Sequence, residues 1–135
     1  MTTVTPKNSA LSQQVFDDIK KTRNTNYINN FWRDLSHNDE ELYNTWSALK
    51  SVMSEGEIPY LYKEMIYVAV SIANNCNYCI HSHTYAAKKS GMTDVQYKEL
   101  LSVILMANKT NALATALGTQ VDDVLDTSKE GEPRK

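Results

Sequence analysis

Residues 64–83 read EMIYVAVSIANNCNYCIHSH, and this stretch decides both the fold class and the chemistry of the chain. After Glu64 its first half is almost entirely apolar, which is typical of a helix that packs on several sides. Asn74 and Asn75 then interrupt the apolar run, because asparagine favours helix caps and tolerates left-handed backbone geometry. We therefore expect one helix that ends at about Ala73, a tight break, and a second helix that starts around Cys76.

Two cysteines and a histidine share one side of that second helix. At about 100° per residue, Cys76, Cys79 and His83 fall within roughly 60° of one another, and Cys79 and His83 are one turn apart. Only the thiolate of a cysteine is a good nucleophile, so a histidine that takes its proton activates it, and the positive end of a helix favours the same anion. The spacing predicts a redox-active dithiol that can close a disulfide.

Glu64 lies one helix before the histidine. If the chain folds back at Asn74 and Asn75, the Glu64 carboxylate could approach His83 or a thiol. It would then orient the imidazole and accept its proton, as the third member of a proton relay. Sequence gives no distance between these groups, so Glu64 is at this point either a relay member or a structural carboxylate.

The rest of the chain also reads as helical. Glycine and proline are scarce, with 4 and 3 residues, and strand-like alternation is hard to find. Because apolar helices over 59–73 and 94–117 bracket the cysteine helix, we expect that helix at the centre of a helical bundle. The expected helices run from Ser9 or Ser12 to about Arg23, over 26–35, from Asn38 to Gly56, from Pro59 to Ala73, from Cys76 to Gly91, from Thr93 to Gly118 with a kink or interruption at 109–111, and over 121–125.

Length and composition point to one domain of an ordinary soluble protein. The 135 residues suit a single domain over residues 1–126, followed by the polar tail TSKEGEPRK (127–135), which we expect to be disordered. With a net charge of −2 and no basic cluster, the chain is not expected to bind nucleic acid. The polar start of the chain lacks the apolar stretch of a signal peptide, and the apolar run at 65–73 is roughly half the length that a membrane span needs. We expect a cytoplasmic protein with no membrane partner.

Other interpretations of the same residues stay open. A zinc or iron site could draw on Cys76, Cys79, His81 and His83, although one helical segment rarely wraps a tetrahedral ion and no second ligand pair exists. The cysteines could also be two buried apolar residues. His81 faces away from Cys79 and is expected at the surface or in an interface. Aromatic residues are expected mainly as core or subunit contacts, with Tyr78 as a candidate substrate contact: Trp32, Trp46, Tyr60, Tyr62, Tyr67, Tyr78 and Tyr85.

The pattern E-x11-C-x-Y-C-x3-H resembles the carboxymuconolactone decarboxylase-like proteins, and more closely their alkylhydroperoxidase D-like branch. It falls on Glu64, Cys76, Tyr78, Cys79 and His83. The resemblance covers about residues 40–118. In the best-known members of the branch a histidine precedes the second cysteine, where this chain has a tyrosine. The pattern continues through an A-x3-G segment and a threonine-capped helix, at Ala87, Gly91 and Thr93.

This resemblance implies a compact all-α fold around an antiparallel helical hairpin, assembled as trimers or hexamers. The branch reduces hydroperoxides with its cysteine pair and is re-reduced by an external dithiol such as dihydrolipoamide or by a redox protein. For this chain we expect no metal and no bound cofactor. By position, the proton relay to Cys76 and Cys79 falls on Glu64 and His83. Decarboxylase members lack the cysteine pair, so its presence here argues against decarboxylation.

We therefore expect a thiol-dependent antioxidant enzyme. Cys79 is favoured as the attacking thiol because His83 is its one-turn neighbour, while the start of the helix favours Cys76, and the balance between them is close to even. Two rival functions remain. One is a non-catalytic, redox-sensing oligomeric helical protein, and the other is a metal-binding protein.

Overall fold

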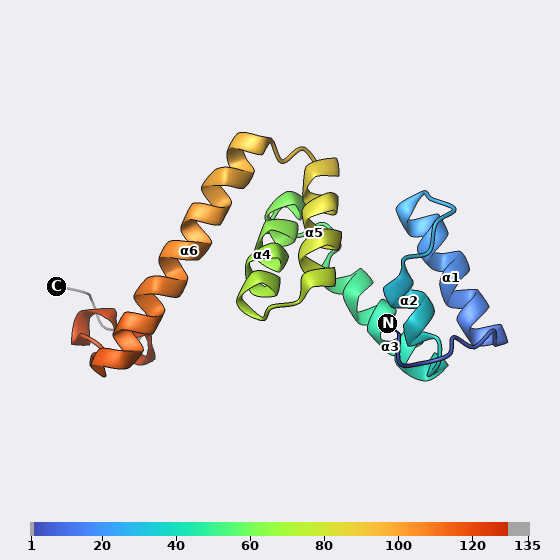
Figure 1. Ribbon diagram of the computed structural model, residues 1–135, viewed down its shortest axis with the longest axis horizontal. Helices are drawn as coiled ribbons and strands as arrows, with labels where there is room; N and C mark the ends of the chain where they lie inside the picture. Colours follow the sequence, from blue (N-terminus) through green and yellow to red (C-terminus); the bar gives the residue numbers. More distant parts are fainter. Residues whose placement is uncertain (1, 130–135) are drawn as a thin grey trace. The chain divides into compact units, whose positions relative to one another are not determined.

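The computed structural model describes residues 2–129 (Figure 1). These residues contain six α-helices and two short 3-10 helices, and no strand occurs among them. The predicted all-α class is confirmed. In chain order the elements are α1 (Ala10–Arg23), α2 (Asn30–Leu35), α3 (Asp39–Val52), α4 (Tyr60–Ala73), α5 (Asn77–Lys89), α6 (Asp94–Leu117), η1 (Asp123–Leu125) and η2 (Thr127–Lys129).

The chain divides into two compact units, Met1–Glu57 and Ile58–Lys135, each with its own packing. The single domain expected over residues 1–126 stays a prediction. The disordered tail expected over 127–135 likewise stays a prediction; at its start the Asp126 carboxylate accepts hydrogen bonds from the backbone and hydroxyl of Ser128. The remaining tail residues, 130–135, lie outside the described residues.

The first unit closes α1, α2 and α3 on a small apolar core. Trp32 and Trp46 meet edge to face with ring centroids 5.4 Å apart, and the Arg23 guanidinium lies over both rings. Ser9 and Asn38 cap the starts of α1 and α3, as predicted. The buried core residues are Val15, Ile19, Ile28, Trp32, Leu42 and Trp46.

Helix boundaries in this unit differ from the sequence expectations at two places. α2 is shorter than the apolar pattern over 26–35 suggested, and Ile28 is buried in the loop before it. α3 ends at Val52 and not at Gly56, since none of residues 53–56 is buried and packing therefore does not extend the helix. Burial of an apolar side chain therefore does not require that its residue be helical.

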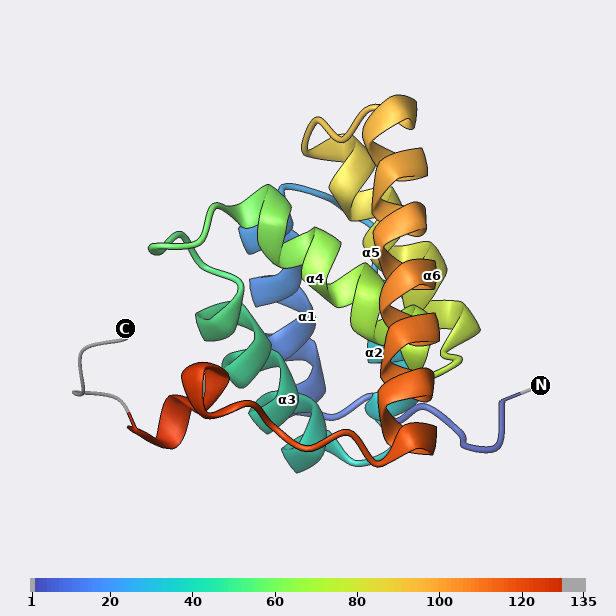
Figure 2. The ribbon, with the colours of Figure 1, turned by 90° about the vertical axis from the view of Figure 1, so that its left-hand side faces the viewer.

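In the second unit α4 is the central helix, because it packs against both α5 and α6. This corrects the expectation that the cysteine helix would lie at the centre. The reason lies in the side chains: α4 buries Glu64, Val68 and Ser71, whereas Ala87 is the one fully buried residue of α5. α4 and α5 form the helical hairpin and lie side by side in Figure 1, whereas in Figure 2 α6 lies in front of α5.

The break between α4 and α5 forms where the sequence predicts it. Asn75 adopts the left-handed conformation, with φ 56°. The backbone N–H of Cys76 then donates to the carbonyl of Ser71 at 3.0 Å, and Cys76 caps the start of α5. Gly91, at φ 109°, permits the next turn, which the capping box of Thr93 follows. The tight return brings the first turns of α5 beside the end of α4.

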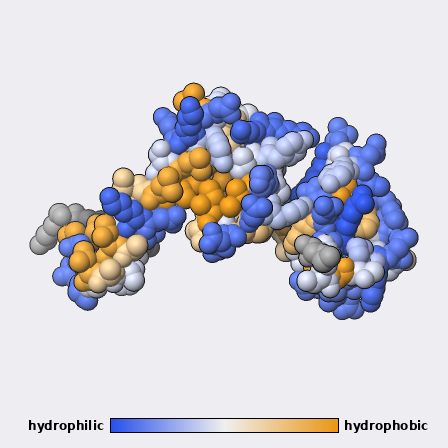
Figure 3. Space-filling view, viewed as in Figure 1, coloured by the Kyte–Doolittle hydropathy of each residue, from blue (hydrophilic) through white to orange (hydrophobic). Residues whose placement is uncertain are grey.

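α6 runs without interruption for 24 residues, Asp94–Leu117, and Gly118 caps its end, so the interruption expected at 109–111 does not occur. Thr110 fits the helix by donating its hydroxyl to the carbonyl of Ala107 at 3.3 Å. Within the described residues α6 is the one helix long and apolar enough to cross a membrane, by length and composition alone. Most of α6 is exposed, and Figure 3 shows hydrophobic surface along its middle and near the turns that follow it.

Candidate redox site

One face of α4 carries four polar or aromatic side chains, two of which contact His83 on α5. Tyr60, Glu64, Tyr67 and Ser71 follow one another at spacings of four, three and four residues, which places them in one line along the helix. Glu64 and Ser71 are buried, although polar side chains usually remain exposed. This line of polar side chains forms one wall of the candidate site, and His83 from α5 forms the other.

Glu64 and His83 form a close pair across the two helices. Oε2 of Glu64 lies 2.7 Å from Nδ1 of His83, and the side chains are 5% and 18% exposed. A carboxylate oxygen carries no hydrogen of its own when ionised, so at this distance Nδ1–H donates to it. The contact leaves the other ring nitrogen, Nε2, to exchange a proton with a third group.

The second carboxylate oxygen of Glu64 is also satisfied. The hydroxyl of Tyr60 donates to Oε1 at 2.7 Å, from one turn earlier on α4. Burying a carboxylate is costly unless donors replace the lost water, and Tyr60 and His83 supply one to each oxygen. The hydrogen bond from Tyr60 orients the carboxylate, and the oriented carboxylate in turn fixes the position of the His83 ring.

Tyr67 contacts the same imidazole from a different direction. Its ring lies nearly parallel to that of His83, with centroids 3.7 Å apart and an interplanar angle of 18°. Glu64 and Tyr67 are three residues apart on α4, so one turn of helix supplies both contacts. The imidazole is consequently held at its edge by a carboxylate and on its face by an aromatic ring.

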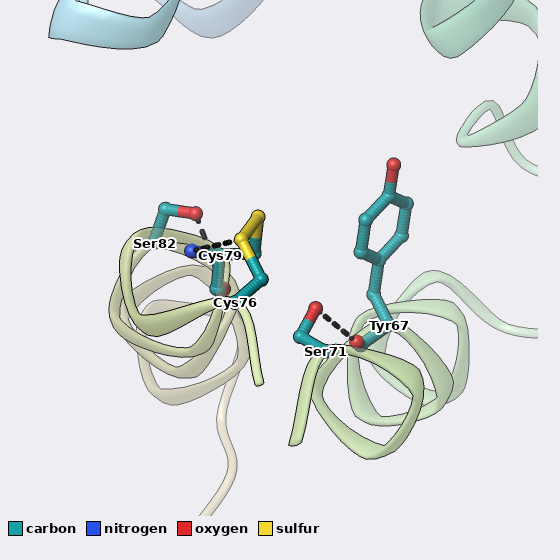
Figure 4. Close-up of a disulfide and its surroundings, with 5 residues drawn as sticks. All are labelled: Tyr67, Ser71, Cys76, Cys79 and Ser82. Atoms are coloured by element: carbon teal, nitrogen blue, oxygen red, sulfur yellow. Dashed lines mark hydrogen bonds between the residues drawn. A yellow bond between two sulfur atoms is a disulfide. The ribbon is translucent and has the colours of Figure 1, made fainter. Parts of the chain in front are cut away.

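Cys76 and Cys79 form a disulfide at the start of α5. Cys76 is the N-cap of that helix, and the backbone N–H of Cys79 donates to the Cys76 sulfur at 3.3 Å. Figure 4 shows the disulfide and the Tyr67 ring projecting toward the same side of the α4–α5 pair. The positive end of α5 therefore points at sulfur, where it would stabilise a thiolate once the bond is reduced.

The structure brings together most of the residues that the sequence singled out. Glu64 approaches His83 rather than a thiol, and the cysteines pair with each other one turn before the histidine. Tyr78, between the cysteines, is 42% exposed. His81 lies at the surface. The catalytic roles assigned to these residues stay predictions.

Two residues that the sequence did not single out belong to the site. Tyr60 and Tyr67 were expected to be core or subunit-contact aromatics, yet one donates to Glu64 and the other stacks on His83. The available signal was their position: they lie four residues before and three residues after Glu64, on the same face of α4. Among residues 2–129, no group of three or more histidine, cysteine or acidic side chains is arranged to hold a metal ion.

Comparison with known proteins identifies the family. The model of the carboxymuconolactone decarboxylase family matches residues 40–119, which is more than half of the chain. No curated protein matches. The crystal structure of the alkylhydroperoxidase AhpD core from Rhodospirillum rubrum is similar, with 45% sequence identity and a TM-score of 0.87. That match covers 91% of this chain and 96% of the other.

The family and the fold predicted from the cysteine motif are thus both confirmed. The chain, helical over its described residues and with a Cys-x-x-Cys disulfide, matches the family model over residues 40–119, and its fold agrees with that of an alkylhydroperoxidase core. The chain therefore belongs to the carboxymuconolactone decarboxylase family and has an AhpD-like fold.

Proposed function

We propose that this protein is a thiol-dependent peroxidase that reduces organic hydroperoxides with Cys76 and Cys79. The observation that carries the proposal is the close pair of buried Glu64 on α4 and partly buried His83 on α5, with Oε2 and Nδ1 2.7 Å apart, where α5 also carries the disulfide. A structural disulfide needs no proton acceptor nearby, whereas a dithiol that cycles between oxidation states does.

The first step is proton transfer and attack. Nε2 of His83 takes the proton of Cys79, one turn earlier on α5, while Glu64 holds the ring at Nδ1. The thiolate attacks the distal oxygen of the hydroperoxide, and the O–O bond breaks. Sulfur becomes a sulfenic acid, and the leaving alkoxide takes a proton, from the imidazolium or from water, to become an alcohol.

The second step closes the disulfide. The sulfur of Cys76 attacks the sulfenic acid of Cys79, the S–O bond breaks, and water leaves. The N–H of Cys79 that points at the Cys76 sulfur supports negative charge there, so Cys76 can attack as a thiolate, and its proton leaves with the sulfenic oxygen as water. An external dithiol such as dihydrolipoamide, or a redox protein, then exchanges with the disulfide and restores both thiols. Both proposed reductants are used in the reducing cytoplasm, where we place this protein.

We further propose that the protein works as a homo-oligomer that forms through α6. Val103, Met106, Thr110, Leu113 and Leu117 recur at spacings of three and four residues, the pattern by which helices pair. The four apolar members are 50–76% exposed within the described residues. A stripe of this kind exceeds the scattered apolar exposure of a monomer surface, so a second copy is its proposed partner. The choice between a trimer and a hexamer rests on the family resemblance alone.

Steady-state turnover tests the peroxidase proposal. The pre-reduced protein is supplied with an organic hydroperoxide and dihydrolipoamide, and variants Cys76→Ser, Cys79→Ser and His83→Ala are compared with it. His81→Ala is the matched control, because His81 is an exposed histidine of the same helix. We expect turnover to be lost in the cysteine variants, to fall in His83→Ala, and to persist in His81→Ala.

The same variants identify the attacking thiol. When a hydroperoxide is added to Cys76→Ser, we expect a sulfenic acid on Cys79 that a dione reagent traps. Trapping in Cys79→Ser alone would reverse the order of the two cysteines. If a disulfide forms and is reduced in the native protein without any turnover, the peroxidase proposal is wrong, and the protein is a redox sensor or an enzyme with another class of substrate.

A further inference from the structure

The ring of Tyr67 covers one face of the His83 imidazole, at a centroid distance of 3.7 Å. We propose that Tyr67 is a positioning residue that stabilises the charged, imidazolium form of His83 and thereby favours the reactive thiolate. This inference deepens the thiol chemistry proposed above and rests on it. The proposal gives a reason for an aromatic residue at position 67, because an aliphatic side chain would offer His83 no ring face.

The two contacts on His83 restrain different motions. The hydrogen bond to Glu64 acts in the plane of the imidazole, at Nδ1. The stack on Tyr67 acts perpendicular to that plane, because the two rings are within 18° of parallel. Together they leave the Nε2 edge of the ring as the part available for proton exchange. His83 is thus pre-organised before substrate arrives, which lowers the reorganisation needed for proton transfer.

The stack is stronger after proton transfer than before it. When the thiol gives its proton to His83, the neutral imidazole becomes a cation and the sulfur becomes an anion. The S–H bond breaks, an N–H bond forms, and no other bond changes. The face of an aromatic ring carries negative potential and attracts a cation placed over it. Tyr67 therefore favours the thiolate–imidazolium state over the neutral pair, and a contact that favours one state over another shifts their equilibrium.

The groups around the imidazole make this contribution separable. From α4 it faces Glu64 and Tyr67, and Tyr60 acts on it through the carboxylate. On its own helix the cysteines lie one turn earlier. Charged groups at the junction of α5 with α6 are engaged with one another: the Lys88 ammonium pairs with Asp94 and lies over the ring of Tyr97.

A pH titration of the thiolate tests the proposal without any peroxide. The ultraviolet absorbance of the thiolate is followed against pH in the pre-reduced protein and in Tyr67→Leu and Tyr67→Phe. Leucine removes the aromatic face, whereas phenylalanine keeps it. Tyr62→Leu is the matched control, because Tyr62 is a tyrosine of the same helix that is 55% exposed. We expect the midpoint to rise by about 0.5 to 1 pH unit in Tyr67→Leu and to stay near the native value in the other two.

Two results would overturn the proposal. An unchanged midpoint in Tyr67→Leu would show that the stack does not favour the thiolate. An equal rise in Tyr67→Phe would assign the effect to the hydroxyl and not to the ring face. Neither result depends on peroxide turnover, so failure of this inference is distinguishable from failure of the peroxidase proposal.

A measurement on the native protein keeps the test valid if Tyr67→Leu does not fold. A proton of an imidazole that lies on a tyrosine face is shifted upfield in the NMR spectrum by the ring current. We expect one of the three histidine ring signals to be shifted in this way and to disappear in His83→Gln. An unshifted His83 signal in the reduced protein would contradict the stack.

Discussion

Oε2 of Glu64 lies 2.7 Å from Nδ1 of His83, although the two residues are nineteen positions apart in the chain. The left-handed residue Asn75 makes this contact possible, since it turns the chain tightly between the helices that carry the pair. Each member has a further partner on α4, Tyr60 for the carboxylate and Tyr67 for the imidazole. The four side chains form one connected network, in which a change at one residue should be felt at the others.

Glu64→Gln should reduce turnover by about 10- to 100-fold while the protein stays folded. Glutamine keeps the volume of the side chain and can still accept from Nδ1–H, but it carries no charge to stabilise the imidazolium. The measurement is kcat for organic hydroperoxide at saturating dithiol. Glu99→Gln is the control, because Glu99 is an exposed carboxylate on α6. A Glu64→Gln enzyme with native kcat would exclude the carboxylate from the relay.

Tyr60→Phe should destabilise the fold by about 1 to 3 kcal/mol, because it leaves Oε1 of the buried Glu64 carboxylate without its tyrosine donor. The measurement is the midpoint of urea unfolding, with the thiols reduced in all samples. Tyr62→Phe, at an exposed site on the same helix, should change stability by less than about 0.5 kcal/mol. Equal midpoints for the native protein and Tyr60→Phe would mean that the hydrogen bond contributes nothing.

Helix α6 gives a prediction about assembly. Replacing Met106 and Leu113 with glutamate places charge in the exposed apolar stripe and should dissociate the oligomer, as measured by sedimentation velocity. Asn108→Glu adds charge on another face of the same helix and should leave the assembly intact. A monomeric native protein would contradict the interface. Binding of that monomer to lipid vesicles would show instead that the stripe contacts a membrane.

In the first unit, the stability contribution of Asp18 should depend on pH. The indole N–H of Trp46 and then the Lys50 ammonium hold the pKa of this carboxyl below its usual value. A lowered pKa means that the ionised form stabilises the fold above the unfolded value, about 3.9, and that this contribution is lost as pH falls through the folded value.

Asp18→Asn should therefore be less stable than the native protein at neutral pH, by about 1 kcal/mol, since the side chain is 40% exposed and solvent weakens the pairing. The difference should shrink as pH falls below about 4. Urea unfolding at several pH values measures it, with Asp17→Asn as the control at a neighbouring exposed site. A difference that stays constant between neutral and acidic pH would rule out the contribution of charge.

The sequence predicted local structure well because caps and breaks are local. Ser9, Asn38 and Thr93 cap helices where their side chains suggested, and the Asn74–Asn75 break and Gly118 end helices as expected. These signals depend on residues within one turn, which a sequence displays directly.

Features that depend on tertiary contact were harder to predict. The central position of α4 depends on which faces find partners, and a strongly apolar α6 was not a guide to its burial, since most of it is exposed. Tyr60 and Tyr67 were interpreted by residue type alone. Their roles become visible once the helical spacing from Glu64 is combined with the position of His83 on the facing helix.

A single-turnover experiment tests the proposed peroxidase chemistry of Cys76 and Cys79 most directly. One equivalent of an organic hydroperoxide is mixed with pre-reduced protein, and free thiols and the alcohol product are counted over time. We expect each protein chain to lose two thiols and to form one alcohol and one Cys76–Cys79 disulfide, and we expect Glu64→Gln and His83→Ala to slow this conversion. Thiols that persist while the hydroperoxide remains intact would contradict the proposed peroxidase function.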